Sequence, residues 1–194
     1  MNDHVITIVS GLPRTGTSLM MQMIHAGGIP ALTDKVRASD EDNPRGYLEL
    51  EAVKRTRKDD SWLTEARGRV VKMVHLLLYD LPGHHQYRVV FMRRDLREVV
   101  RSQGVMLERR GTDGAHLTDE QLIRAYEGQL TKIERWLDEQ PNFQIHQVSY
   151  NTLMSDPPPA VSAIKAFLGD GLDGDAMLAS IDPTLYRQRQ GGGT

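Results

Sequence analysis

The sequence has no cysteine, few aromatic residues (6%) and no long apolar run. Without cysteine the chain can form neither a disulfide nor a thiolate metal site, and it has no thiol nucleophile. The apolar runs are too short to span a membrane, and the N-terminus lacks the features of a signal peptide. The 24 basic and 26 acidic residues leave no net positive charge that would attract nucleic acid or an anionic membrane. We therefore expect a cytoplasmic protein without a nucleic-acid or membrane partner.

What the sequence does contain is typical of a globular protein. Its 194 residues correspond to one domain, and we expect that domain to span residues 1–194. Eighteen of the 24 basic residues are arginine. The planar guanidinium group binds pairs of phosphate or sulfate oxygens, although a GC-rich genome also favours arginine codons. The positions of the arginines must therefore decide whether they bind an anion.

Apolar and polar patterns predict strands that alternate with helices. Strands are expected over residues 5–9, 69–75, 87–92 and 143–148. Helices are expected after residue 17, after residue 95 and over residues 49–58, 118–139, 157–169 and 174–181. This alternation predicts an α/β fold of three layers, in which helices cover both faces of a mainly parallel central sheet. Ligands of such sheets bind at the C-terminal ends of the strands.

The segment between the first predicted strand and the first helix has nearly the spacing of a phosphate-binding P-loop. It reads Gly11-Leu12-Pro13-Arg14-Thr15-Gly16-Thr17-Ser18, with Gly first, Gly sixth and Ser eighth. Such a loop directs backbone N–H groups at an anion, and the helix N-terminus adds about half a positive charge. Thr17 stands where a nucleoside triphosphatase has lysine, and Arg14 supplies the cation from inside the loop. The alternative is an ordinary Gly-Pro turn between a strand and a helix.

A triphosphate-cleaving enzyme also needs Mg²⁺, usually held by an aspartate at the end of an apolar strand. The best candidate is the segment 76–80, which ends in Asp80 but which we interpret as a turn or short helix. The sequence therefore predicts a P-loop fold that binds phosphate, with incomplete equipment for a kinase.

A second anion site is predicted at the end of the third strand, where Arg93 and Arg94 stand. Asp95 is expected to cap the next helix, with Glu98 as its capping-box partner. Ser102 then lies two turns along the helix, on nearly the same face as the cap. We expect Arg94 and Ser102 to hold one anion together. The alternative is that both arginines face solvent or pair with Asp95 and Glu98.

The two motifs together resemble those of the sulfotransferase family that uses 3′-phosphoadenosine 5′-phosphosulfate (PAPS), in its compact bacterial type. In that family a Pro-Lys/Arg-Ser/Thr-Gly-Thr-Thr/Ser loop cradles the 5′-phosphosulfate, and a strand-terminal Arg with a Ser eight residues later holds the 3′-phosphate. The resemblance implies that the donor is bound by Pro13, Arg14, Thr15, Gly16, Thr17, Ser18, Arg94 and Ser102. It departs from the family at Leu19, where many members have a tryptophan that stacks on adenine. In the C-terminal tail, Arg189 is a loose match to the family's Arg-Lys-Gly segment on the 3′-phosphate.

The resemblance implies transfer of a sulfuryl group from PAPS to a hydroxyl or amine of an unidentified acceptor, leaving adenosine 3′,5′-bisphosphate (PAP). Arg14 and the loop N–H groups would stabilise charge on the leaving phosphate, so no metal ion is required. Two residues are candidates for the base that takes the acceptor's proton. Glu49 ends an Asn-Pro-x-Gly-aromatic-x-Glu segment similar to that of bacterial relatives, and it is slightly favoured. His75 closes the second strand, where Lys72 and His75 resemble the family's Lys-Thr-His arrangement; Lys72 would help to neutralise the sulfate.

Two other functions stay open on the sequence alone. One is a P-loop kinase for a small molecule, which would use ATP and Mg²⁺, and the other is a nucleotide-binding module without catalytic activity. The acceptor pocket is expected from residues 29–65 and 104–125, which carry no motif. Trp62, Trp136 and Tyr126 either line that pocket or pack in the core. The sequence carries no signal for the oligomeric state.

Overall fold

The computed structural model describes residues 5–34, 36, 46–109 and 117–182. Its centre is a parallel sheet of four strands in the order β2-β1-β3-β4. The strands are β1 (Val5–Gly11), β2 (Val70–Lys72), β3 (Gln86–Arg93) and β4 (Phe143–Ser149). The register is continuous across the sheet, since Val9 pairs with both Lys72 and Val90. The predicted α/β fold with a mainly parallel central sheet is confirmed.

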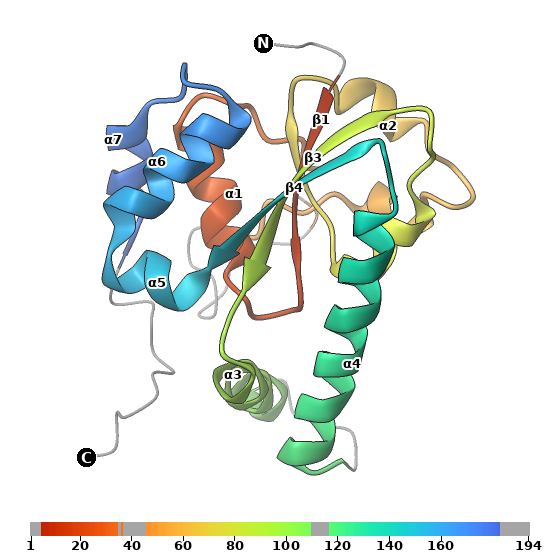
Figure 1. Cartoon of the computed structure of the whole chain (residues 1–194), viewed down its shortest axis with the longest axis vertical. Coiled ribbons are helices and arrows are strands. Elements are labelled where there is room, and N and C mark those ends of the chain that lie inside the picture. The colour runs from red at the N-terminus through yellow and green to blue at the C-terminus, as the bar shows by residue number, and fades with distance from the viewer. Residues whose placement is uncertain (1–4, 35, 37–45, 110–116, 183–194) are drawn as a thin grey trace.

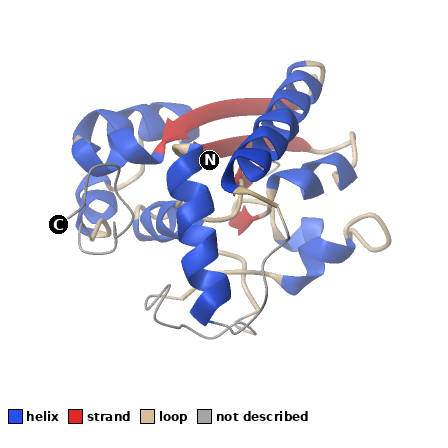
Figure 2. Cartoon of the chain, turned by 90° about the horizontal axis from the view of Figure 1, so that it is seen from below, coloured by secondary structure: helices blue, strands red, loops and turns tan. Residues whose placement is uncertain are grey.

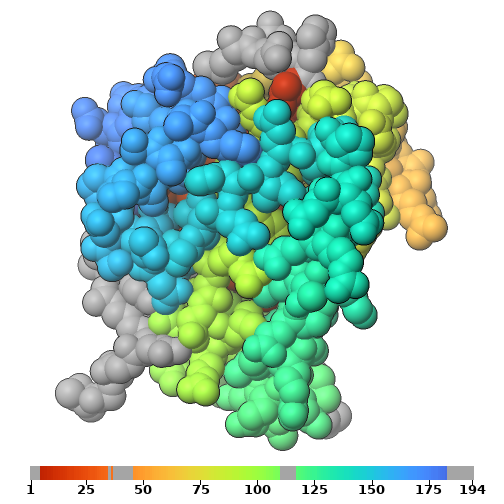
Figure 3. Space-filling model, in the orientation of Figure 1, coloured from red at the N-terminus to blue at the C-terminus, as the bar shows by residue number. Residues whose placement is uncertain are grey.

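Helices cover both faces of this sheet (Figures 1 and 2). One face carries α1 (Thr17–Ala26), α5 (Tyr150–Ser155), α6 (Pro157–Leu168) and α7 (Gly174–Ala179). The other carries α2 (Trp62–Glu65), α4 (Asp119–Asp138) and the 3-10 helices η1 (Glu51–Arg55) and η2 (His75–Asp80). The remaining helix, α3 (Leu96–Arg109), follows β3 and lies beyond the carboxyl end of that strand (Figure 1). In the space-filling view, α6 and α4 lie on either side of β4 (Figure 3).

The alternation of side chains along the strands produces two separate cores. On β3, Val89 and Phe91 pack toward α4, whereas Val90 and Met92 pack toward α1 and α6. All four side chains are at most 1% exposed. Helices contribute one apolar stripe each, as α4 does with residues spaced three and four apart: Leu130, Ile133 and Leu137. This arrangement is the three-layer packing that the sequence predicts.

Two elements differ in extent or type from the sequence prediction. The second strand ends at Lys72, because the chain turns into η2 at His75. The helix expected over 49–58 is a 3-10 helix confined to Glu51–Arg55.

Within residues 5–34, 46–109 and 117–182, no helix combines the length and apolar character needed to cross a membrane.

The start of α3 differs from the predicted capping box. The Asp95 carboxylate accepts hydrogen bonds from the backbone N–H of Arg97 and Glu98, as expected of a cap. The Glu98 carboxylate, however, accepts from Arg94, and the Asp95 N–H donates to Asn151 on α5. The buried Arg94 guanidinium takes Glu98 as its counter-charge, which ties the helix start to the end of β3.

Candidate functional site

The topology creates a crevice at the carboxyl ends of the strands. The chain leaves β1 for β2 on one side and later returns to β3 on the other, so the connections after β1 and β3 diverge. Ligands of open α/β sheets bind at such a switch point. A cavity of about 510 Å³ lies there, within the range of small-molecule sites. Its lining includes residues of the loop after β1 and of α3.

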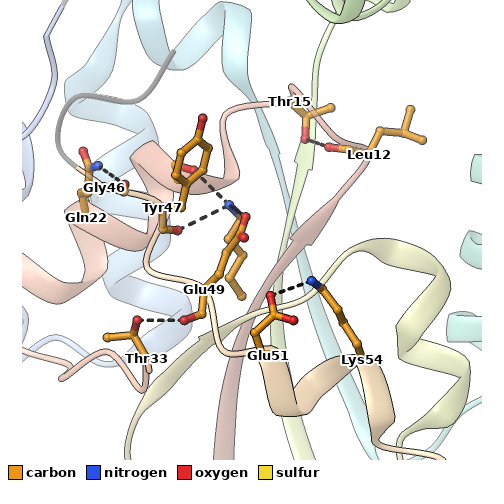
Figure 4. A network of polar contacts seen from close by, with 11 residues as sticks. Leu12, Thr15, Gln22, Thr33, Gly46, Tyr47, Glu49, Glu51 and Lys54 are labelled. Atoms are coloured by element: carbon orange, nitrogen blue, oxygen red, sulfur yellow. Dashed lines mark hydrogen bonds and ion pairs between the residues drawn. The ribbon is translucent and has the colours of Figure 1, made fainter. Parts of the chain in front are cut away.

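The loop after β1, residues 11–18, is called the anion loop below. Gly16 caps α1 with φ 91°, and a side chain at this position would collide with the ring of Tyr150. Arg14 has φ 69°, a left-handed conformation that is uncommon outside glycine. The Thr15 hydroxyl donates to the Leu12 carbonyl at 2.7 Å and closes the turn from inside (Figure 4). The N–H groups at the start of α1 thus belong to a tightly folded, glycine-dependent loop at the cavity.

Five of the six residues predicted for this loop line the cavity: Pro13, Arg14, Gly16, Thr17 and Ser18. Thr15 does not, because its side chain is 1% exposed and its hydroxyl bonds to the loop backbone. The Thr15 side chain therefore shapes the loop rather than facing the cavity.

The second predicted anion site meets the first. Arg14 Nε donates to Ser102 Oγ over 2.9 Å, although the two residues are 88 positions apart. Arg94 also lines the cavity, and its Nη1 donates to the Arg14 carbonyl at 3.1 Å. Arg94 Nε pairs with Glu98 Oε2 at 2.9 Å, so Arg94 and Ser102 are both joined to Arg14, and the grip of these two residues on one anion stays a prediction. Arg93 points elsewhere and pairs with Glu134 of α4, outside the cavity lining.

Lys72 and Glu49 form the third cluster of charge in the cavity. Lys72 Nζ lies 2.9 Å from Glu49 Oε1 and 3.0 Å from Ser18 Oγ. It also donates to the Tyr47 carbonyl at 3.4 Å. The Glu49 backbone is held in turn by Thr33, whose hydroxyl donates to the Glu49 carbonyl at 2.8 Å (Figure 4). Two residues predicted to take part in the chemistry therefore meet beside the anion loop.

His75, the other candidate base, is placed differently. Its side chain is 2% exposed and does not line the cavity. Its Nε2 lies 3.0 Å from Gln129 Oε1 on α4. Burial lowers the pKa of His75 from its usual value, against the opposing effects of hydrogen bonds with Gln129 and the Gly11 backbone. The structure thus separates the two candidates: Glu49 faces the cavity and His75 packs against α4.

Sequence reasoning missed Tyr150 and most of the remaining cavity lining. Tyr150 begins α5 directly after β4, and its ring centroid lies 4.6 Å from the Arg94 guanidinium carbon. Its only sequence signal is its place at the end of a predicted strand. The rest of the lining is mixed, and its polar or charged members are Gln22, Glu51, Lys54, Gln103, Arg109 and Asp182. Seven of its aliphatic members are called the apolar wall: Leu50, Val53, Met73, Val74, Leu77, Val105 and Met106.

The apolar wall comes partly from the two regions expected to form the acceptor pocket and partly from the chain after β2. Trp62 packs in the core and donates to Thr56, while Trp136 and Tyr126 pack against that core and do not line the cavity. Arg189 lies outside the described residues. In the described part of the chain, no group of three or more His, Asp or Glu side chains is arranged to hold a metal ion.

Comparisons with known proteins identify the family and proteins of similar fold. A family model described as "Sulfotransferase family" matches residues 46–173, a span that begins after the anion loop. No curated protein matches the sequence. The sulfotransferase domain of the Synechococcus PCC 7002 olefin synthase is 15% identical, with a TM-score of 0.55 over 100% of this chain and 90% of that one.

Retinol dehydratase, solved in complex with androsterone and the inactive cofactor PAP, is also similar in fold. It is 15% identical with a TM-score of 0.52, and the match covers 93% of this chain. The chain spans 64% of the length of retinol dehydratase. At this identity the likeness to both structures concerns the fold.

Proposed function

The chain belongs to the sulfotransferase family, and we propose that it transfers a sulfuryl group from PAPS to a hydroxyl or amine of a small acceptor. One observation carries this proposal. Arg14 and Arg94 come from loops after two different strands, and both line one cavity together with Lys72. A donor with two separate anionic ends suits such a site better than a single phosphate does.

The residues present fit PAPS as the donor. The anion loop offers backbone N–H groups and Arg14 to the 5′-phosphosulfate. Ser102 and Arg94, which both hydrogen-bond to Arg14, would hold the 3′-phosphate. The PAP complex of retinol dehydratase, a protein of similar fold, supports the same donor. When bound, PAPS supplies an activated sulfuryl group: a bond from sulfur to the acceptor atom forms, the bond to the 5′-phosphate oxygen breaks, and PAP leaves.

Residues of this chain then stabilise the charge that develops during transfer and accept the proton of the acceptor. Arg14 and the loop N–H groups stabilise negative charge that builds on the 5′-phosphate oxygen, as preorganised donors do in a cavity shielded from water. Lys72 lies beside Ser18 and helps to neutralise the sulfuryl oxygens. These groups supply locally the positive charge that Mg²⁺ supplies in kinases.

Glu49 is the proposed base, because it faces the cavity and His75 does not. A base must lie within hydrogen-bond reach of the proton it removes. The Lys72 ammonium, 2.9 Å away, fixes the Glu49 carboxylate next to the anion loop. The acceptor's proton passes to a Glu49 carboxylate oxygen as the new bond to sulfur forms.

The apolar wall supports an acceptor with a mainly apolar body. A sugar placed against aliphatic side chains would leave several hydroxyl groups without hydrogen-bond partners, which is unfavourable. An apolar body gains from burial, and its one hydroxyl or amine would reach Glu49, which precedes Leu50 of the wall.

Calorimetry with PAP and with ATP–Mg²⁺ tests the donor. We expect PAP to bind without magnesium and at least tenfold more tightly than ATP–Mg²⁺. Preference for ATP–Mg²⁺ would instead identify a small-molecule kinase. PAP binding without turnover of PAPS, on a broad panel of alcohols and amines, would identify a nucleotide-binding module.

A further inference from the structure

Glu98 is the one acidic side chain among the buried residues of the described segments. It lies in the first turn of α3 and is 2% exposed. A buried carboxylate is unfavourable unless it is paired, and Glu98 Oε2 accepts from Arg94 Nε at 2.9 Å. The Arg94 side chain is itself only 7% exposed. Neither the family resemblance nor the mechanism above gives Glu98 a role.

The contacts of Arg94 lead from Glu98 to the anion loop. Arg94 Nη1 donates to the carbonyl oxygen of Arg14, the residue with φ 69°. A left-handed conformation outside glycine is unfavourable and persists only where the surroundings hold it. The ring of Tyr150, whose centroid lies 4.6 Å from the Arg94 guanidinium carbon, fills the space beside Gly16. Glu98 is thus connected through Arg94 to the backbone of the loop at Arg14, and Arg94 is in turn in contact with Tyr150 beside Gly16.

We propose that Glu98 is a positioning residue for the anion loop. By orienting Arg94, it keeps the hydrogen bond to the Arg14 carbonyl in place and maintains the anion-binding shape of the loop before the donor arrives. The expectation that the loop binds the 5′-phosphate end of PAPS rests on the proposed function. The shape of the loop itself does not depend on it.

A positioning role and a simple charge effect predict opposite changes in anion affinity when Glu98 is replaced by a neutral residue. Glu98 brings a negative charge close to an anion site, so replacing it with a neutral residue would raise anion affinity if charge alone mattered. If Glu98 positions Arg94, the same replacement loosens the loop and lowers affinity. Glu98→Asp separates the two further, because it keeps the charge but shortens the side chain by one methylene group.

The experiment compares Glu98→Gln and Glu98→Asp with the intact protein. Calorimetry measures affinity for PAP and for adenosine 5′-monophosphate, which has no 3′-phosphate. We expect both variants to bind both nucleotides less tightly, by about tenfold for Glu98→Gln, the size expected for losing a charged hydrogen bond. Hydrogen–deuterium exchange of residues 11–18 without ligand should rise in both variants. Thermal unfolding identifies any variant that is not folded.

Glu134→Gln is the matched control. It removes the carboxylate partner of Arg93, the neighbour of Arg94, at a place outside the cavity lining. We expect it to leave nucleotide affinity and exchange of the loop unchanged. If Glu98→Gln bound PAP as tightly as the intact protein or more tightly, or lost affinity for PAP but not for adenosine 5′-monophosphate, the proposal that Glu98 positions the loop would be overturned. If the intact protein does not bind PAP, the proposed donor is wrong, and exchange of residues 11–18 still decides the role of Glu98.

Discussion

The anion loop and the apolar wall enclose the same cavity but are built in different ways. The loop is one continuous segment fixed by hydrogen bonds to single partners, such as Arg14 to Ser102 and Arg94 to the Arg14 carbonyl. The wall is assembled from several stretches of chain and is held by packing, with Val74 still 40% exposed. Directed bonds tolerate little substitution, whereas packed aliphatic surfaces tolerate much. Changes in the loop should therefore affect the rate, and changes in the wall should affect which acceptor binds.

Arg14→Ala should show the largest effect. Removing one preorganised donor from a site of developing charge costs about a hundredfold or more in rate. We expect kcat with PAPS to fall by at least about a hundredfold, measured by PAP release. Arg101→Ala is the control, since Arg101 is exposed on α3 and does not line the cavity. Unchanged kinetics in Arg14→Ala would remove this arginine from the mechanism and with it the contrast between loop and wall.

Glu49→Gln tests the residue that lies between the anion loop and the apolar wall. Loss of a general base typically costs a hundredfold or more, and we expect kcat to fall by about a hundredfold. Affinity for PAP, measured by calorimetry, should not fall, because Glu49 is an anion beside an anion site. His75→Gln should keep kcat within about threefold and affect mainly thermal stability, since His75 packs against α4. The reverse pattern would identify His75 as the base.

The sequence allowed the anion loop to be predicted because its information is local. Glycine spacing, the strand before and the helix after can be recognised within one short stretch of chain, and strand ends in a parallel sheet converge on one edge. Arg14 and Arg94 were found in this way, whereas Lys72 was found through its resemblance to the family's Lys-Thr-His arrangement. The loops after β1 and β3 meet because these two strands are parallel neighbours in the sheet, so their carboxyl ends lie side by side.

Features that depend on where a side chain turns could not be predicted. Alternation along the second strand ends at Lys72, so it says nothing about His75, which η2 turns toward Gln129. The pattern Asp95-x-x-Glu98 is that of a capping box, in which Glu98 would accept from the Asp95 N–H. In the structure Glu98 instead accepts from the buried Arg94 side chain, and the burial of Arg94 cannot be inferred from this pattern. The apolar wall has no motif, because its residues meet only through the fold.

Val74→Asn should show the smallest effect, confined to the acceptor. Val74 contributes aliphatic surface to the wall, whereas Leu76, two residues on and 50% exposed, does not line the cavity. With PAP present, octan-1-ol should bind about fivefold more weakly to Val74→Asn, a change of about 1 kcal/mol, close to the value of one buried methylene group. Leu76→Asn should bind it as the intact protein does, and both variants should keep their PAP affinity. Equal losses in the two variants would mean that the alcohol lies on the outer surface, and tighter binding of glucose than of octan-1-ol would show that polar groups govern acceptor choice. If only Val74→Asn loses affinity for octan-1-ol and PAP affinity is unchanged, the apolar wall selects the acceptor, and this role is distinct from that of the anion loop in the transfer.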